Sequence, residues 1–260
     1  LAEYAKTKNV GLFIWYNSGG PHTKVMDAGP RDLMFDRDVR RKEMKRISDL
    51  GIKGIKVDFF QGDKQGTINL YVDIIKDAAD FQLMVNTHGS TIPRGWDRTY
   101  PNLITMEAVR GAELYSSASY PPMAVWQNTI LPFTRNVIGS MDYTPVTFSD
   151  FSPQHIRLTT NAHELALSVI FESGAQHFAD REESFRKQPS QVTEFLKDVP
   201  VTWDDTRFIS GYPGEQVILA RTKDDIIYIA GLNGTMEQFN TSFSVPFINP
   251  NAEYVASIIT

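Results

Sequence analysis

Cysteine is absent from this sequence of 260 residues, which excludes disulfide scaffolds and thiolate metal sites. No stretch approaches the roughly 18 consecutive apolar residues that a membrane-spanning helix requires, and no signal peptide is visible. A G-x-G-x-x-G turn and a P-loop are also missing, so an open nucleotide-binding sheet is not indicated. The five histidines have no close metal-ligand spacing and do not indicate a zinc site.

The composition is that of an ordinary globular protein. Hydrophobic residues make up 42% and charged residues 22% of the chain, and the length allows one large core and a small second domain. The formal net charge of −5 argues against nucleic acid and an anionic membrane as partners. Because the chain starts at Leu1, close to an apparent helix end, we expect it to be a segment of a longer polypeptide.

Apolar runs of strand length alternate with helical patterns over much of the chain. The predicted strands are Val10–Tyr16, Ile52–Phe59, Gln82–Asn86, Leu103–Met106, Thr134–Ser140 and Val169–Phe178. The predicted helices run from Asp36 or Asp38 to Leu50, from Ile68 to Ala79, and from about Gln154 to Ser168. Alternation of this kind is typical of βα repeats with a parallel sheet.

We expect this α/β sheet to be a (β/α)8 barrel of the TIM type, because the Gly-rich first turn of open sheets is missing. Such a barrel needs eight strands, and the sequence predicts six. The first two strands are therefore expected to be absent from this chain.

The pattern changes after about Pro200. Short strands separated by turns are predicted around Phe208–Gly214, Val217–Ala220 and Ile226–Ala230, and Phe243, Val245 and Phe247 alternate with other residues further on. The sequence thus predicts a partial catalytic barrel over residues 1–199 and a partial, sandwich-like antiparallel β module over residues 200–260.

Asp58 lies near the C-terminal end of an apolar predicted strand, and barrel enzymes carry their catalytic groups at such strand ends. Lys56 is two residues earlier, so it faces the same side and favours the ionised carboxylate that a nucleophile needs. A structural role is equally compatible, in which Asp58 caps the next helix or pairs with Lys56 or Arg110.

Glu107 closes the next-but-one predicted strand, and Glu113 follows it closely. They fit a solvated pair of surface carboxylates, and they also fit ligands of a hard cation such as Ca²⁺. Two carboxylates at a suitable separation can also cleave a glycosidic bond.

Polar and aromatic residues near the other strand ends have open interpretations. Asn86 and His88 end one predicted strand, where His88 could donate a hydrogen bond to a sugar hydroxyl or serve a structural purpose. Trp15 and Trp96 fit stacking on a sugar ring and packing in the core equally well.

Five short strings together resemble glycoside hydrolase family 97 in their order and spacing. They are Gly-Ile-Lys-Val-Asp-Phe (54–59), Val-Asn-Thr-His-Gly (85–89), Arg-Thr-Tyr-Pro-Asn-Leu (98–103), Met-Glu-Ala-Val-Arg-Gly-Ala-Glu (106–113) and Gly-Ser-Met-Asp-Tyr-Thr-Pro (139–145). The resemblance covers essentially the whole chain. It implies an N-terminal β-sandwich, a (β/α)8 catalytic barrel, a C-terminal β module, a need for Ca²⁺, and activity on α-glycosides.

The resemblance also implies roles for individual residues. Asp58 matches the nucleophile at the end of the fourth barrel strand, and Glu113 matches the general acid/base. Glu107 and Glu113 match calcium ligands. We expect the substrate to be contacted by residues at the strand ends, namely Lys56, Asn86 and His88.

The family has an inverting α-glucosidase branch and a retaining α-galactosidase branch. Inverting members carry a base glutamate directly after the histidine of the Val-Asn-x-His segment, where this sequence has Gly89. The loop Ser18-Gly19-Gly20, where the other base lies, contains no glutamate, while Asp58 is present. The pattern resembles the retaining branch.

The resulting prediction is a calcium-dependent, retaining, exo-acting α-galactosidase that hydrolyses terminal α-galactosides by double displacement. Two alternatives are an inverting α-glucosidase of the same family and a non-catalytic carbohydrate-binding fragment. The expected partners are an oligosaccharide and the N-terminal β-sandwich of the same polypeptide. The resemblance implies a periplasmic or secreted location.

Overall fold

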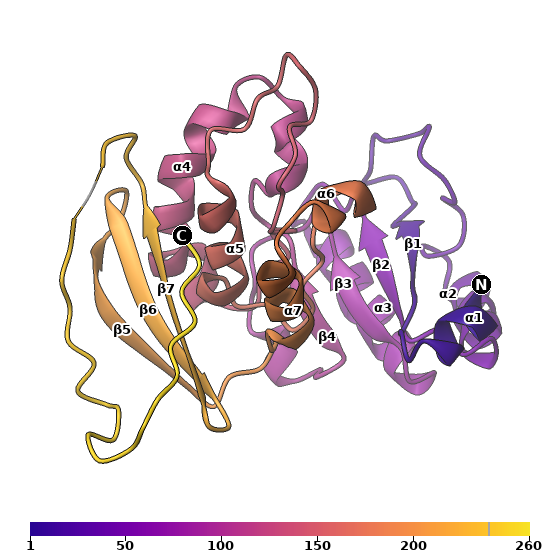
Figure 1. The fold of residues 1–260 in the computed structure, drawn as a ribbon. Coiled ribbons are helices and arrows are strands. Elements are labelled where there is room, and N and C mark those ends of the chain that lie inside the picture. Colours follow the sequence, from indigo (N-terminus) through magenta and orange to yellow (C-terminus); the bar gives the residue numbers. More distant parts are fainter. Residues whose placement is uncertain (239) are drawn as a thin grey trace. The chain divides into compact units, whose positions relative to one another are not determined.

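The computed structural model describes residues 1–238 and 240–260, and packing divides the chain into two compact units (Figure 1). The first unit comprises Leu1–Val109, Ile138–Asp142 and Ser173–Ala175. The second comprises Arg110–Val137, Tyr143–Glu172 and Gln176–Thr260. This division does not test the predicted boundary between residues 199 and 200, which stays a prediction.

The elements of the described residues are strands, α-helices and short 3₁₀ helices. The strands are β1 (Phe13–Asn17), β2 (Gly54–Asp58), β3 (Met84–Thr87), β4 (Leu103–Met106), β5 (Asp205–Tyr212), β6 (Gln216–Lys223) and β7 (Ile226–Asn233). The α-helices are α1 (Ala2–Thr7), α2 (Arg37–Asp49), α3 (Gln65–Asp80), α4 (Tyr120–Ile130), α5 (Asn161–Ile170), α6 (Glu182–Arg186) and α7 (Ser190–Asp198). The 3₁₀ helices are η1 (Trp96–Arg98), η2 (Ala112–Ser116), η3 (Leu131–Phe133) and η4 (Arg135–Val137).

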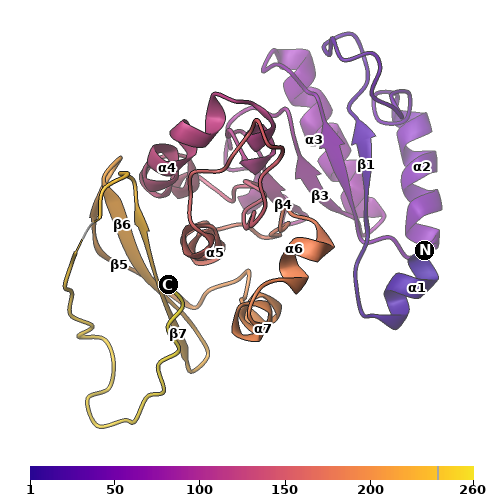
Figure 2. The same cartoon turned by 45° about the horizontal axis from the view of Figure 1, so that its top comes forward.

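The first unit is built on a parallel sheet with the strand order β1-β2-β3-β4 (Figure 1). Strands β1, β3 and β4 of this sheet are also labelled in Figure 2. This confirms the predicted parallel sheet and the approximate positions of its first four strands. Asn17 pairs with Asp58, and Lys56 pairs with Asn86. Because all four strands run in one direction, their C-terminal ends lie at the same edge of the sheet.

Helix α2, which connects β1 to β2, begins at a residue that its sequence indicates. The Asp36 carboxylate accepts hydrogen bonds from the backbone N–H of Asp38 and Val39, which makes Asp36 the N-cap of α2. Gly51 follows the helix with φ +80°, a conformation that glycine adopts without strain. Leu50, at which the predicted helix ends, is 55% exposed.

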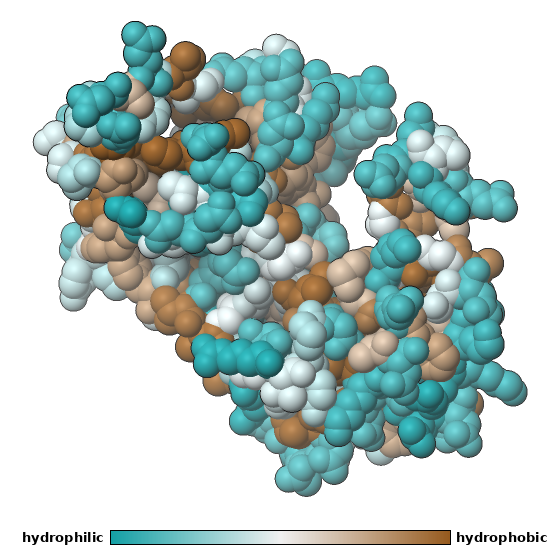
Figure 3. Space-filling model, turned by 90° about the horizontal axis from the view of Figure 1, so that it is seen from below, coloured by the Kyte–Doolittle hydropathy of each residue, from teal (hydrophilic) through white to brown (hydrophobic). Residues whose placement is uncertain are grey.

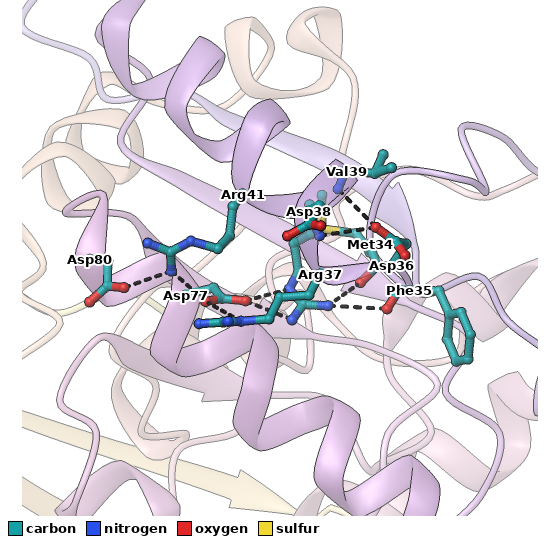
Figure 4. Close-up of polar contacts among 10 residues, drawn as sticks. Met34, Phe35, Asp36, Arg37, Asp38, Val39, Arg41, Asp77 and Asp80 are labelled. Atoms are coloured by element: carbon teal, nitrogen blue, oxygen red, sulfur yellow. Dashed lines mark hydrogen bonds and ion pairs between the residues drawn. The ribbon is translucent and has the colours of Figure 1, made fainter.

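A charged network joins α2 to α3 (Figure 4). Arg40 is 1% exposed, and its Nε and Nη2 donate to Asp77 Oδ2 at 2.9 and 2.6 Å. Its Nη1 also donates to the Met34 carbonyl at 2.8 Å. Arg41 connects the Asp77 and Asp80 carboxylates at 2.5 and 2.7 Å. The network therefore fixes both helices and the loop before α2.

The second unit contains the antiparallel sheet β5-β6-β7, with α4 and α5 packed against β7. The predicted antiparallel strands after Pro200 are thus confirmed. Phe243, Val245 and Phe247, whose alternation suggested a further strand, lie outside strands in the described part of this unit.

The last two predicted parallel strands are wrong. Residues 134–140 contain η4 and no strand, and the run from Val169 begins as the last turn of α5. Here the Asn136 side chain, rather than a neighbouring strand, bonds to the backbone of Glu172. It donates to the Glu172 carbonyl at 2.9 Å and accepts from the Glu172 N–H at 2.7 Å. Val137 is 67% exposed, so its apolar character does not mark a buried strand. The parallel sheet has four strands within residues 1–238 and 240–260, and its closure into a barrel stays a proposal.

The face of the molecule shown in Figure 3 is mostly hydrophilic, with apolar residues grouped among the polar ones. Exposed apolar side chains of the second unit include Val137 and Phe208.

No helix in the described ranges combines the length and the apolar character that a bilayer crossing requires.

Candidate active site

Polar side chains occupy the edge of the first unit at which the parallel strands end. Asn17, Asp58 and Thr87 are the last residues of β1, β2 and β3, and Glu107 directly follows β4. His88 comes immediately after β3, and its N–H bonds to the Val57 carbonyl at 2.9 Å. The sheet therefore brings Asp58, His88 and Glu107 to one edge, as the sequence indicated.

Two N–H donors orient the half-buried carboxylate of Asp58. Trp15 Nε1 donates to Asp58 Oδ2 at 3.2 Å, and the backbone N–H of Phe59 donates to Asp58 Oδ1 at 2.6 Å. Phe59 has φ +63°, which is an uncommon conformation for a bulky residue. Asp58 is thus fixed in direction at the end of β2.

Three predicted substrate-binding residues converge on a carboxylate that the sequence did not single out. Asp142 Oδ2 lies 2.5 Å from Asn86 Nδ2, 2.6 Å from His88 Nε2 and 4.0 Å from Lys56 Nζ. Asp142 is 1% exposed. The ion pair of Lys56 is therefore with Asp142, rather than with Asp58 as the structural interpretation suggested.

Glu107 bonds to the segment that follows β3. Its Oε2 accepts from the Gly89 N–H at 2.7 Å, and its Oε1 lies 3.4 Å from His88 Nδ1. Oxygen donors from carboxylates are the ligands that Ca²⁺ prefers. The position and chemistry of Glu107 fit the predicted role of a calcium ligand.

Gly89 lies so close to Asp58 that a side chain cannot be accommodated there. Its φ is +51°, and a Cβ atom would meet the Phe59 N and Cα at 2.9 Å and Asp58 Oδ1 at 3.1 Å. Real Cβ contacts of this length with backbone do not occur without a shift of the chain. The glycine is therefore a steric requirement of the Asp58 conformation.

Glu113 belongs to the second unit and is exposed on η2. The helix is held by Ala112, whose N–H bonds to the Tyr143 carbonyl at 2.9 Å, and by Tyr115, whose hydroxyl bonds to Glu164 at 2.7 Å. Burial raises the pKa of Glu164, and the bonds from Thr159 and Tyr115 act in the opposite direction. Because Asp58 and Glu113 belong to different units, the separation of their carboxyl groups stays a prediction.

The two tryptophans differ in their environment. Trp96 packs against Tyr71 with ring centroids 5.3 Å apart, at the side of the hydrophobic core, which favours the core interpretation. Trp15 contacts Asp58 and the Phe59 ring, at 5.8 Å between centroids, and so belongs to the candidate site.

Sequence reasoning missed the parts that Asp142 and Trp15 play in this arrangement. Asp142 lies in the string 139–145 that carried the family resemblance, and it follows an apolar residue as the other site carboxylates do. That local pattern was the available signal. Nothing in the spacing of Trp15 and Asp58, 43 positions apart, indicates their hydrogen bond.

Family models match both ends of the chain. The model described as glycoside hydrolase 97 matches residues 1–109, and the one described as glycosyl-hydrolase 97 C-terminal, oligomerisation matches residues 202–260.

Three similar proteins agree with these matches. A probable retaining alpha-galactosidase of Streptomyces bingchenggensis is 38% identical over 89% of this chain and 33% of its own length. A retaining alpha-galactosidase of Bacteroides thetaiotaomicron is 30% identical over 89% of this chain and 34% of its own. A crystal structure of a beta-arabinopyranosidase superposes with a TM-score of 0.85 at 40% identity, covering 89% of this chain and 38% of that one. The chain thus spans about a third of the length of the curated relatives it matches.

Proposed function

The chain belongs to glycoside hydrolase family 97, and on that premise we propose that it carries the catalytic residues of a calcium-dependent, retaining, exo-acting α-galactosidase. The similarity to a probable and a named retaining alpha-galactosidase supports the reaction and the sugar. We propose this galactosidase activity for the full-length natural polypeptide that contains the chain.

In this proposal Asp58 attacks the anomeric carbon of a terminal α-galactoside, and Glu113 protonates the departing oxygen. Water then hydrolyses the glycosyl-enzyme with Glu113 as the base, so that two inversions give net retention. The two carboxyl groups are then expected to lie about 5–5.5 Å apart. The hydrogen bonds from Trp15 and Phe59 hold the Asp58 carboxylate in one direction, which is what a nucleophile needs.

The observation that carries the retaining mechanism is the contact between Gly89 and Asp58. A side chain at position 89 would collide with the Phe59 backbone and approach Asp58 Oδ1 at 3.1 Å. A base glutamate at that position, as in the inverting branch, is therefore incompatible with the present conformation of Asp58. This supports double displacement over single displacement.

The decisive experiment replaces Asp58 by asparagine. Asp58→Asn should abolish hydrolysis of 4-nitrophenyl α-galactoside, and azide should restore turnover with a β-galactosyl azide as product. Asp63→Asn, at an exposed carboxylate five positions along the chain, is the matched control and should retain activity. Normal turnover by Asp58→Asn would exclude Asp58 as the nucleophile.

For calcium, we propose Glu107 and Glu113 as ligands. The cation would supply positive charge beside the acid/base carboxyl group, which alters its acidity. Exhaustive chelation should abolish activity, and added Ca²⁺ should restore it, measured as kcat/KM against free Ca²⁺. Unchanged activity after chelation would contradict the requirement while leaving the Asp58 assignment intact.

A second candidate substrate comes from the similarity to the beta-arabinopyranosidase. Arabinopyranose of the L series has the ring configuration of D-galactose without the C6 hydroxymethyl group, so one site can bind both sugars. Comparing kcat/KM for 4-nitrophenyl α-D-galactoside and β-L-arabinopyranoside decides which sugar is preferred. A preference for α-glucoside would support the inverting branch instead, and binding without turnover would support a carbohydrate-binding fragment.

The remaining expectations complete the proposal. We propose that β1 to β4 are the third to sixth strands of a (β/α)8 barrel and that an N-terminal β-sandwich of the same polypeptide accompanies them. The whole protein would then act on oligosaccharides in the periplasm or outside the cell.

A further inference from the structure

Asp142 is a buried carboxylate directly beside the candidate site. It closes the segment Ile138–Asp142, which belongs to the first unit. Met141 forms a parallel bridge with Met106 of β4, and the Asp142 N–H bonds to the Met106 carbonyl at 3.0 Å. These backbone contacts place the carboxylate at the edge where the strands end.

A single oxygen of Asp142 contacts three groups, which lie on β2, on β3 and directly after β3. Asn86 Nδ2 lies at 2.5 Å and His88 Nε2 at 2.6 Å from Oδ2, and Lys56 Nζ lies at 4.0 Å. An ionised carboxylate can only accept hydrogen bonds, so the nitrogens of Asn86 and His88 that face it must donate. Asp142 thereby fixes the orientation of the Asn86 amide and the ring nitrogen of His88 that carries hydrogen.

The three groups point to the side of the sheet that also carries Asp58. Lys56 and Asp58 are two residues apart on β2, so their side chains share a face. Lys56 and Asn86 are direct partners across β2 and β3. Asn86 and His88 are again two residues apart, which keeps them on one side.

We propose that Asp142 is a positioning residue of the active site, which holds Lys56, Asn86 and His88 in the arrangement that receives the sugar next to Asp58. Asp142 acts through these side chains, because it is itself 1% exposed. The proposal rests on the proposed function and adds a residue to its binding machinery. A structural carboxylate would stabilise the fold without affecting turnover by folded enzyme, and this difference is measurable.

The test uses Asp142→Asn in the longest natural polypeptide that contains the chain, assayed on both aryl glycosides. Loss of the charge lets the three groups shift, and a misplacement of about 1 Å costs on the order of 100-fold in rate. We expect kcat/KM per folded molecule to fall by about 100-fold. A double-mutant cycle with Lys56→Met should show a combined loss close to that of the more severe single variant, because both changes disturb one arrangement.

Glu43→Gln is the matched control. Glu43 is also a buried carboxylate of the first unit, and it accepts a hydrogen bond from the Tyr16 hydroxyl at 2.6 Å and pairs with Arg46. Its replacement should lower Tm while kcat/KM of the folded enzyme stays unchanged. If Asp142→Asn does not fold, Asp142→Ser with added formate replaces it, and formate should raise kcat/KM.

Two results would overturn the inference. In one, Asp142→Asn behaves like Glu43→Gln, with a lower Tm and normal kcat/KM. In the other, the losses of Asp142→Asn and Lys56→Met multiply, which would show that they act independently. If the wild-type protein were inactive on both glycosides, the proposed function itself would be contradicted. That result is distinguishable from the two above, which contradict only the role of Asp142.

Discussion

Gly89 has a left-handed backbone conformation and lies directly beside Asp58, the proposed nucleophile. Gly89→Ala should destabilise the protein by about 1–3 kcal/mol, because a non-glycine residue would adopt a left-handed conformation against the Phe59 backbone. It should also lower kcat/KM by displacing Asp58. Thermal unfolding and kinetics measure the two effects. Gly66→Ala is the control, since a Cβ at Gly66 meets no atom within 4 Å; equal effects at both positions would contradict the steric argument.

Individual site residues were predictable to different degrees. Asp58, His88 and Glu107 follow from one rule, that polar residues ending parallel strands gather at one edge. Asp142 could not be placed in this way, because its segment joins the sheet through one bridge rather than through the predicted strand. The bond from Trp15 to Asp58 depends on the register of β1 against β2 and on the side-chain rotamers, which strand periodicity does not specify.

Between elements, the Arg40–Asp77 pair is the contact with the clearest energetic consequence. Asp77→Ala should destabilise the protein by about 3–5 kcal/mol, because it leaves the buried Arg40 guanidinium without its carboxylate. The double variant Arg40→Met/Asp77→Leu should recover much of that loss. Urea unfolding measures both. The exposed pair Arg186–Glu182 is the control, and Glu182→Gln should leave the free energy of unfolding almost unchanged.

Elements with a long amphipathic pattern were predictable, and short apolar runs were not. The start of α2 at Asp36, one of the two predicted caps, was predictable because capping chemistry is local. The sequence predicts a strand at Val169 and Ile170, yet they complete α5, because a short buried run has the same apolar character in either state. The amide of Asn136 then bonds to Glu172 where a backbone ladder was expected.

For the molecule as a whole, the lowered pKa of His163 predicts that the folded protein loses stability in acid. Burial lowers the pKa of His163 to about 4, and the Arg157 charge acts in the same direction. His163 is protonated near pH 6.5 in the unfolded chain but only near pH 4 in the folded protein. The stabilisation is complete above pH 6.5 and is lost as the pH falls toward 4, by at most about 3 kcal/mol.

His163→Gln isolates this contribution from those of the carboxyl groups. The variant should be less dependent on pH than the wild type between pH 6.5 and 4, measured by urea unfolding at a series of pH values. Parallel curves for the two proteins would show that His163 does not cause the acid sensitivity.

The hydrogen bond from Trp15 to Asp58 has an optical consequence. An indole whose N–H faces a carboxylate emits differently when that carboxylate becomes an ester, because the charge beside the ring disappears. Formation of a covalent glycosyl-enzyme on Asp58 would therefore register as a change in intrinsic fluorescence, and Trp15→Phe would remove it. Under the proposed mechanism, Trp15 would report the chemical step in a stopped-flow instrument without any added label.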